Sequence, residues 1–334
     1  ATGLVNAVLR RLVREIGQVP WPDPVAKPLD HLTWTESLPA WLARRWLSEL
    51  GDEAAALAQA LRQPAPFTLR VNTLKTTRAD FLEQLAAAGH QARATSYAPE
   101  GIRLLRRGPG ELPGNQEGLY QVQDEASMLI AHLLAPAPGE KLLDVCAAPG
   151  GKTTHLAALS DNRAEIQALD LHANRLNFIR EGAARLGCRG ITPRAWDATR
   201  PASFLAVGSF DGVLVDAPCS GLGVLRRNPE ARWRLQEEDI SQLAGRQAAL
   251  LDQSARLVRP GGRLVYSVCT VTPEETDQVI ASFLNRHTTF QPSSILPLLP
   301  AACRELVDAS ERLRTWPHRH DIDGFFAVRL QRQA

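Results

Sequence analysis

Short apolar runs alternate with amphipathic stretches through the second half of the chain, from about residue 120. The apolar runs have the length of strands, and several are rich in β-branched residues. They cover residues 140–146, 164–170, 190–195, 210–218, 262–270 and 324–330. Segments with helical periodicity lie at 152–160, 172–187, 236–259 and 273–287. This alternation predicts an α/β fold in which a mostly parallel sheet carries helices on both faces.

The first 120 residues are organised differently. Leu, Val and Ile recur at helical spacing over residues 4–16, a proline-rich stretch follows, and the helical pattern returns at 38–62. Residues 67–107 give strand, helix and strand in quick succession, which indicates a small α/β module of a kind common in RNA-associated proteins. We therefore expect an N-terminal helix over 1–17, a helical linker region over 18–65, the small module over 66–118 and the large sheet over 119–334.

The composition excludes several classes of protein. No apolar run approaches the length needed to cross a bilayer, so we expect no membrane partner. The five cysteines are an odd number without regular spacing, and no CxxC pair or Cys/His cluster has the spacing of a zinc site. We therefore expect no disulfide framework, no metal, and the reducing environment of the cytoplasm.

Charge leaves the partner open. The formal net charge is +2, which by itself predicts no polyanion, but 34 of the 38 basic residues are arginine. Guanidinium groups bind phosphate in bidentate fashion and stack on bases, so this bias is compatible with nucleic acid. Codon usage in a GC-rich genome produces the same bias, and composition alone does not separate the two causes.

The loop after the first strand of the large sheet is rich in small residues. It consists of Cys146, Ala147, Ala148, Pro149, Gly150, Gly151 and Lys152. Small side chains let the backbone approach a ligand, and the helix that follows offers free N–H groups. A P-loop needs glycine where Cys146 stands, and the GxGxxG dinucleotide pattern is broken. The segment is therefore a ligand loop of another kind or an ordinary tight connection.

Acidic residues and cysteines follow the other strands. Asp170 ends the second strand, Asp197 follows the third, Asp216 and Cys219 follow the fourth, and Cys269 follows the fifth. Because the carboxyl ends of parallel strands meet at one edge, we expect these side chains to share a crevice. Asp170 and Asp197 could instead cap a helix or a turn, and a lone buried cysteine is usually inert packing. Two cysteines that converge beside an acid are harder to explain in that way.

Three acids around a glycine-rich loop suit a ligand with a ribose, an adenine and a cationic or zwitterionic tail. S-adenosylmethionine has these parts, and its positive sulfonium does not need the Lys/Arg set of a nucleoside triphosphate site. A thiolate in the same crevice supplies a nucleophile. Its addition to carbon 6 of a pyrimidine makes carbon 5 reactive enough to accept a methyl group, and a nearby acid can assist at N3.

Three motifs resemble those of the NOL1/NOP2/Sun family of RNA 5-methylcytosine methyltransferases, and most closely its bacterial branch that acts on small-subunit ribosomal RNA. They are CAAPGGKTTH, VDAPCSGLGVLRRNPE and YSVCTVTPEE, and the likeness extends from LVNAVLRRL through VQDEASM to DGFFAVRL. The resemblance implies a Rossmann-like S-adenosylmethionine-dependent fold and methylation of carbon 5 of a specific cytosine. The implied partner is small-subunit ribosomal RNA before full assembly, and the implied oligomeric state is a monomer.

The resemblance also implies how the cofactor is held. The loop over residues 146–152 surrounds the methionine part, Asp170 binds the ribose, and Asp197 lies beside the adenine. Asp216 lies at the boundary between cofactor and substrate, where it supports the activated ring.

Family members use two cysteines for different tasks. By resemblance, Cys269 is the nucleophile and Cys219 assists release of the methylated RNA. Val268 stands where many members have threonine, a change that removes a hydroxyl but keeps the nucleophile. Members of this type carry a NusB-like helical domain ahead of the catalytic part, and we expect only its last helix here, within residues 1–17.

Basic and aromatic residues that follow Cys219 are candidate RNA contacts. They are Arg226, Arg227, Arg232, Trp233 and Arg234. Arginine together with an exposed aromatic ring can hold phosphate and stack a flipped base. The alternative is a solvated loop in which Trp233 is a packing anchor.

Three other functions stay open at this point. They are a non-catalytic RNA-binding assembly factor, an ATP- or GTP-dependent RNA enzyme that uses GGKTT as a phosphate loop, and the same chemistry on transfer RNA or large-subunit RNA. Retention of both cysteines with every acid weighs against the first, and Cys146 weighs against the second.

Overall fold

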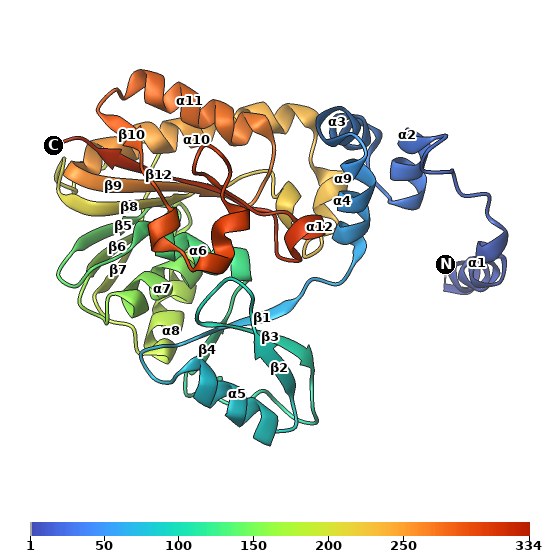
Figure 1. Cartoon of the computed structure of the whole chain (residues 1–334), viewed down its shortest axis with the longest axis horizontal. Coiled ribbons are helices and arrows are strands. Elements are labelled where there is room, and N and C mark those ends of the chain that lie inside the picture. Colours follow the sequence, from blue (N-terminus) through green and yellow to red (C-terminus); the bar gives the residue numbers. More distant parts are fainter. Residues whose placement is uncertain (1) are drawn as a thin grey trace. The chain divides into compact units, whose positions relative to one another are not determined.

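The computed structural model describes residues 2–334, and Ala1, where the expected N-terminal helix begins, lies outside the described residues. The chain divides into two compact units, one ending at Arg62 and the other spanning Gln63–Ala334 (Figure 1). Among residues 2–334, no helix combines the length and the apolar character that crossing a membrane requires.

The described part of the first unit consists of helices. Its elements are α1 (Thr2–Glu15), η1 (Ile16–Gln18), α2 (Pro28–Asp30), η2 (His31–Thr35), α3 (Ala40–Leu50) and α4 (Glu53–Arg62). Gly51 ends α3 with a positive φ of 56°, and α4 then packs on α3. Leu42, Trp46 and Leu57 on these two helices are buried, whereas the apolar side chains of α1, such as Leu12, are exposed.

A small antiparallel sheet opens the second unit. Its strands lie in the order β2 (Gln91–Ala94), β3 (Gly101–Arg106), β1 (Phe67–Val71) and β4 (Tyr120–Val122), and α5 (Arg78–Ala87) packs on it. Phe81 and Leu85 of α5 are buried against Leu69 and Ile102. The sequence pattern groups Tyr120 with the large sheet, but β4 pairs with β1 and so completes the small one.

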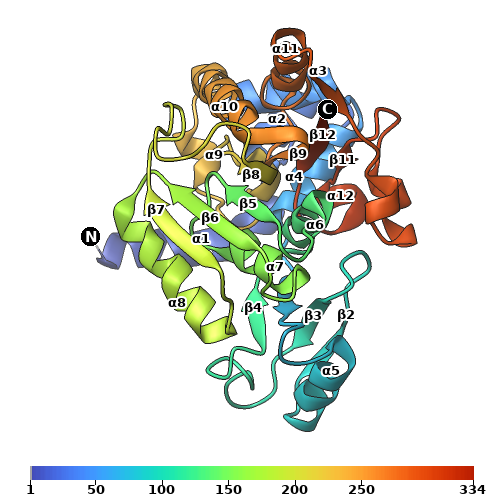
Figure 2. The ribbon, with the colours of Figure 1, turned by 90° about the vertical axis from the view of Figure 1, so that its left-hand side faces the viewer.

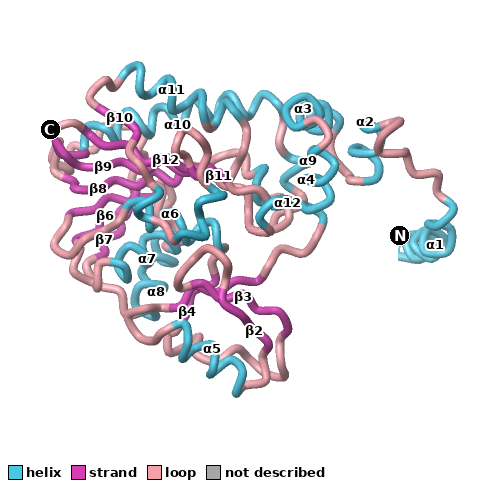
Figure 3. The backbone as a smooth tube through the Cα atoms, viewed as in Figure 1, coloured by secondary structure: helices cyan, strands magenta, loops and turns pink. Residues whose placement is uncertain are grey.

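The strands of the large sheet lie side by side (magenta in Figure 3). Its centre is parallel and one edge is antiparallel. Its strands are β5 (Lys141–Asp144), β6 (Glu165–Asp170), β7 (Ile191–Ala195), β8 (Phe210–Asp216), β9 (Val258–Val268), β10 (Phe290–Pro292), β11 (Leu313–Arg314) and β12 (Phe326–Arg332). They run in the order β10-β12-β9-β8-β5-β6-β7, with β11 paired to β12. The strand order therefore reverses between β5 and β8, and α/β folds bind ligands at such a switch point.

Helices cover both faces of this sheet (Figure 2). On one face lie α6 (Glu125–Leu134), α7 (Gly151–Leu159) and α8 (Leu176–Leu186), and on the other lie α10 (Glu237–Leu257) and α11 (Asp277–Arg286). The remaining helical turns are η3 (Ala173–Arg175), η4 (Leu222–Val224), α9 (Ala231–Arg234), η5 (Pro273–Glu275), η6 (Leu296–Leu298), η7 (Ala301–Leu306) and α12 (Pro317–His320). Each face buries its own apolar core.

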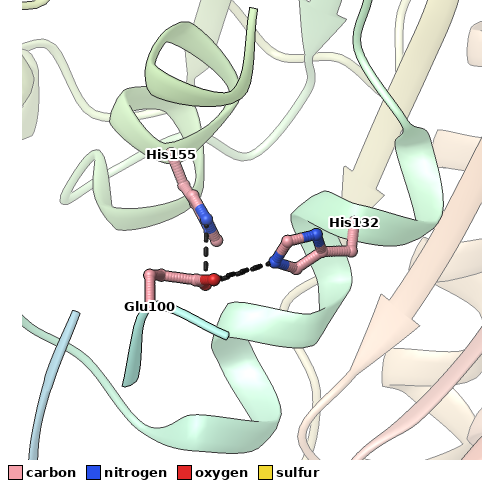
Figure 4. A group of neighbouring side chains, drawn as sticks. All are labelled: Glu100, His132 and His155. Atoms are coloured by element: carbon pink, nitrogen blue, oxygen red, sulfur yellow. Dashed lines mark hydrogen bonds and ion pairs between the residues drawn. The ribbon is translucent and has the colours of Figure 1, made fainter. Parts of the chain in front are cut away.

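Glu100 joins the small module to two helices that pack on the large sheet (Figure 4). Its carboxylate lies 3.1 Å from Nε2 of His132 on α6 and 3.0 Å from Nε2 of His155 on α7. Burial lowers the pKa of His155 to about 4, although the charge of Glu100 opposes the shift. His155 is therefore neutral at pH 7, and the buried guanidinium of Arg70, which Glu100 also balances, supplies the cation of this cluster.

Acid should weaken the fold through His155. The unfolded chain binds a proton at an ordinary imidazole near pH 6.5, whereas folded His155 does so only near pH 4, so stability falls as the pH drops between these values. The loss by pH 4.5 is about 2 kcal/mol. His155→Gln should remove this part of the dependence of stability on pH. Urea unfolding at pH 7 and pH 4.5 measures this slope as the difference in the free energy of unfolding. His172→Gln, at an exposed position, is the control that keeps the slope, and equal slopes in the two variants would contradict the assignment.

Candidate active site at the switch point of the large sheet

A cavity of about 540 Å³ lies at the carboxyl ends of β5 and β8. Its walls come from the loop after β5, from the end of β8, and from residues of the small module such as Phe67 and Gln123. Asp216, Cys269 and Lys152 also line it. The structure therefore brings three groups that the sequence analysis singled out to one crevice at the switch point.

The ligand loop over residues 146–152 is fixed from the side of α8 and β6. Gly150 has a φ of +101°, and a Cβ there would lie 3.1 Å from the backbone Cα of Ile179, so only glycine fits. The carboxylate of Asp170 accepts a hydrogen bond from the Ala148 amide at 3.1 Å. Asp170 thus shapes the loop and lies next to the cavity rather than among the residues that line it.

Arg70 of β1 supports the same loop from the side of the small module. Its guanidinium donates to the carbonyl of Gly151, to Oγ1 of Thr154 at 2.9 Å and to Oε1 of Gln123 at 2.5 Å. Burial lowers the pKa of Arg70 to about 10, and the Glu100 carboxylate opposes the shift. The loop therefore takes its conformation from both sheets of the second unit.

Asp216 holds a fixed position at the end of β8. Its Oδ2 lies 2.7 Å from Nζ of Lys152, and its Oδ1 accepts from Oγ of Ser267 at 2.7 Å. Ser267 stands next to Val268 on the neighbouring strand β9. The pairing of β8 with β9 thus places this carboxylate on the same edge as Cys269.

Asp144 is an acid of the site that the sequence analysis did not single out. It is 1% exposed, its Oδ2 accepts from Oγ1 of Thr153 at 2.7 Å, and its Oδ1 has no hydrogen-bond partner among residues 2–334. Burial raises the pKa of Asp144 to about 7, and the charge of Asp216 adds to the shift. Asp144 ends an apolar strand, which is the signal that drew attention to Asp216, so the sequence contained the clue.

The two cysteines of the proposed pair face each other. Sγ of Cys219 lies 3.3 Å from Sγ of Cys269, although the residues are fifty positions apart. Cys188 hydrogen-bonds to Thr154, and Cys303 to Tyr97, so neither belongs to this pair. Burial and the nearby acids raise the pKa of Cys146, which therefore remains a neutral thiol in the ligand loop.

Asp197 does not line the cavity of about 540 Å³, and its hydrogen bonds are made within its own turn. Its Oδ1 accepts from the amide of Thr199 at 3.1 Å and from Oγ1 of Thr199 at 2.6 Å, which is the turn-forming arrangement considered from the sequence. The hydrogen bond from the Thr199 side chain lowers the pKa of Asp197. Its neighbours Trp196 and Ala198 line a second hollow of about 230 Å³.

The candidate RNA contacts divide into buried and exposed residues. Arg226 is buried, with Nε 2.8 Å from Oδ1 of Asp323, and Arg232 is buried as well. A buried guanidinium presents no donors to RNA, so these two residues do not fit the predicted role of RNA contacts. Arg227 lines the cavity and pairs with Asp323 and with Asp124. Trp233 and Arg234 are exposed, and the Trp233 side chain is therefore not a packing anchor.

The charges along the cavity fit S-adenosylmethionine. The unpartnered carboxylate oxygen of Asp144 is buried, and burying it is costly unless a donor such as an ammonium group meets it. Acidic side chains outnumber basic ones in the lining, which suits a ligand that carries a sulfonium. The acidic residues are Asp124, Asp144, Asp216 and Asp323, and the basic residues are Lys152 and Arg227.

Two family profiles match the chain. The profile described as "16S rRNA methyltransferase RsmB/F" matches residues 131–331, and the one described as "Methyltr_RsmF/B-like, ferredoxin-like domain" matches residues 38–110. The first profile covers the large sheet from α6 to β12, and with it the cavity and both cysteines of the pair.

Individual proteins agree with these profiles. A protein of Bacillus subtilis (strain 168), named "Probable ribosomal RNA small subunit methyltransferase B", is 39% identical over 98% of this chain and 73% of its own length. A protein of Synechocystis with the same name is 38% identical over 98% of this chain and 74% of its own length. A solved structure of a methyltransferase homolog from Pyrococcus horikoshii is 30% identical, with a TM-score of 0.76 over 90% of this chain and 97% of that one.

These matches confirm the expected Rossmann-like methyltransferase fold and S-adenosylmethionine as its cofactor. They also agree with the resemblance to the bacterial small-subunit branch of the NOL1/NOP2/Sun family. The chain belongs to the RsmB/F family of 16S rRNA methyltransferases.

Proposed function

We propose that the protein methylates carbon 5 of a cytosine in small-subunit ribosomal RNA, through a covalent bond between Cys269 and carbon 6. The observation that carries the proposal is the pair of sulfur atoms 3.3 Å apart, with Cys269 on a cavity that also holds Asp216 and Lys152. A single thiol would suffice for addition to a pyrimidine, whereas two adjacent thiols suit addition followed by assisted release.

The cofactor is held by the ligand loop and the acids around it. The backbone of residues 146–152 lies along its methionine part, and the free oxygen of Asp144 accepts from its ammonium group. Asp170 binds the ribose, and Asp197 lies beside the adenine. When bound, S-adenosylmethionine supplies an electrophilic methyl group on a positive sulfur.

The chain's own residues prepare the cytosine. The thiol of Cys269 loses its proton, and its sulfur bonds to carbon 6. The thiolate brings one negative charge to the ring, and N3 takes up one proton in exchange. The charge of the ring therefore does not change, and carbon 5 becomes electron-rich. Asp216, held by Lys152 and Ser267, accepts a hydrogen bond from the protonated N3 and so stabilises the activated ring.

Release reverses the addition after carbon 5 has gained its methyl group. A base removes the proton from carbon 5, the double bond to carbon 6 re-forms, and the Cys269 sulfur leaves with the bonding electrons while N3 gives up its proton. Cys219 lies 3.3 Å from the departing sulfur, close enough for its thiol to donate a hydrogen bond to the thiolate. That contact assists the departure of Cys269.

We propose that the protein acts as a monomer in the cytoplasm, on RNA that is not yet fully assembled. The chemistry requires both thiols in reduced form, which a reducing compartment maintains, and all five cysteines are free. A target base must also leave its stack to reach the cavity, and that step is easier before ribosomal proteins cover the RNA.

Exposed residues beyond Cys219 are the RNA contacts of this proposal. Trp233 is 58% exposed on α9, and Arg234 is exposed beside it. An exposed indole ring can stack on a base, and an arginine next to it can hold the adjoining phosphate.

Substitution of each cysteine by alanine should give a different phenotype. Cys269→Ala should abolish methylation, because no sulfur can then add to carbon 6. Cys219→Ala should retain addition and methyl transfer but slow the release, and so accumulate a covalent protein–RNA complex. Transfer of labelled methyl groups to a small-subunit RNA transcript measures the first effect, and a slow band on a denaturing gel measures the second.

Cys188→Ala is the matched control for both measurements, since Cys188 hydrogen-bonds to Thr154 away from the pair. It should methylate at the wild-type rate without accumulating an adduct. Activity in Cys269→Ala would overturn the assignment of the nucleophile. Cofactor binding without methylation of any ribosomal RNA by the wild type would favour a non-catalytic assembly factor.

Cofactor affinity should depend on pH through Asp144. Its carboxyl group has a pKa of about 7 in the folded protein, and only the ionised form attracts an ammonium group. Affinity for S-adenosylmethionine should therefore fall about tenfold from pH 8 to pH 6 in the wild type, measured by calorimetry. Asp144→Asn should bind weakly at pH 8 and lose this dependence. Asp161→Asn, at an exposed turn, should behave as wild type, and a pH-dependent Asp144→Asn variant would contradict the prediction.

Trp233→Ala should weaken RNA binding by about tenfold, the value of one lost base–aromatic stack. Fluorescence anisotropy with a small-subunit RNA fragment measures the change, and S-adenosylmethionine affinity should stay at its wild-type value. Phe178→Ala removes an aromatic ring of similar exposure from α8 and serves as the control. Equal RNA affinity of the two variants would remove Trp233 from the interface.

A further inference from the structure

Hydrogen bonds to one buried carboxylate join the loops that follow the two cysteines. Glu275 on η5 is fully buried, and its two oxygens accept four hydrogen bonds. Oε1 accepts from the amide of Ser220 and from Nε2 of Gln247, each at 2.9 Å. Oε2 accepts from the hydroxyl of Ser220 and, at 2.8 Å, from the hydroxyl of Thr272. Glu275 is thus the centre of the local polar network.

This network reaches the immediate neighbours of both cysteines. Ser220 follows Cys219, and its Oγ lies 2.7 Å from Oγ1 of Thr270, which follows Cys269. On the other side of Cys219, the carbonyl of Pro218 accepts from Gln247 at 3.0 Å. The backbone of Cys219 is therefore fixed on both sides, and each connection passes through a donor to Glu275.

The charge of Glu275 is not balanced by a cation among these contacts. All four donors are neutral groups: one amide N–H, one side-chain amide and two hydroxyls. With donors on both oxygens, the side chain acts as an acceptor-only carboxylate. Burial makes its negative charge felt by nearby groups more strongly than in water.

The charge of Glu275 acts on the thiol of Cys219. Its pKa is raised well above the ordinary value, first by the hydrogen bond with Cys269, then by burial, and also by the charges of Cys269 and Glu275. Besides Cys269 and Glu275, Tyr266 is a titratable group near Cys219, and its own pKa is raised strongly by burial. The Tyr266 hydroxyl lies 2.7 Å from the carbonyl oxygen of Glu275 and 3.0 Å from Oε1 of Gln247, and it can donate its one hydrogen to either, so it belongs to the same network.

We propose that Glu275 is a positioning residue for the two-thiol site, which holds the Cys219 loop against Cys269 and keeps the proton of the pair on Cys219. The hydrogen bonds through Ser220 set the position, and the buried charge sets which sulfur retains its hydrogen. Cys219 then faces Cys269 as a thiol, the form in which it can donate to a departing thiolate. This inference rests on the proposed function, to which it adds a residue that touches neither sulfur.

Two substitutions separate charge from position. In Glu275→Gln the amide oxygen can still accept from Ser220 and Gln247, while the amide N–H₂ donates to the hydroxyls, which can turn to accept. That variant loses the charge and keeps the connections. Glu275→Ala loses both. Glu274→Gln removes a neighbouring carboxylate from the same turn and is the matched control.

The decisive measurement follows each thiol separately as a function of pH. The full chain is treated with iodoacetamide between pH 6 and pH 10, and mass spectrometry reports alkylation of the Cys219 and Cys269 peptides. Only the thiolate reacts, so a pKa lower by one unit raises the rate below the midpoint about tenfold. Glu275→Gln should accelerate Cys219 by about this factor at pH 8, whereas Glu274→Gln should match the wild type.

Methylation kinetics supply the second readout. Glu275→Ala should lower kcat at least tenfold with little change in the KM for S-adenosylmethionine, and Glu275→Gln should restore most of the loss. If Cys219 reacts at the same rate in Glu275→Gln and Glu274→Gln, or if Glu275→Ala retains the wild-type kcat, the proposal is wrong. If the thiol profile shifts as described but the wild type methylates no RNA, the role of Glu275 stands and the proposed function fails.

Discussion

A sulfur–sulfur approach of 3.3 Å is the constraint on which the site depends, because two thiols attract each other only weakly. The separation of Cys219 and Cys269 must therefore be fixed by their backbones. The pairing of β8 with β9 fixes the strands that lead to them, and the hydrogen bonds among Ser220, Thr270 and Glu275 fix the loops beyond. A site of this kind is positioned by amides and hydroxyls that take no part in the chemistry.

The edge of the sheet at which these strands end carries mainly acidic side chains. Asp144, Asp170 and Asp216 end three adjacent strands, and the Lys152 ammonium pairs with Asp216. Burial raises the pKa of Asp144 to about 7, and the charges of Asp216 and Asp170 add to the shift. A ligand with phosphates would meet repulsion here, whereas one with a sulfonium and an ammonium relieves it. The electrostatics of the crevice thus favour S-adenosylmethionine over a nucleoside triphosphate independently of any motif.

The sequence predicted the parts of the site that depend on local order along the chain. Apolar strands and their terminal residues are local features, so the ends of β5, β6, β8 and β9 could be located before the structure was known. Long-range pairing could not be predicted in the same way. Arg226 was expected at the surface because its partner Asp323 lies almost a hundred residues away, in a loop with no helical or strand pattern. The exposed strand β2 was not predicted, because it lacks the apolar alternation that marks a half-buried strand.

The small module belongs to the active site and is not an independent appendage. Arg70 of β1 donates across the boundary to the carbonyl of Gly151 and to Thr154, and Gln123 near β4 lines the cavity. A buried guanidinium without these acceptors would be costly, and without Arg70 the ligand loop would lose a donor to the Gly151 carbonyl and to Thr154. Each part therefore stabilises the other. The conformation of the ligand loop therefore depends on hydrogen bonds that the small module supplies.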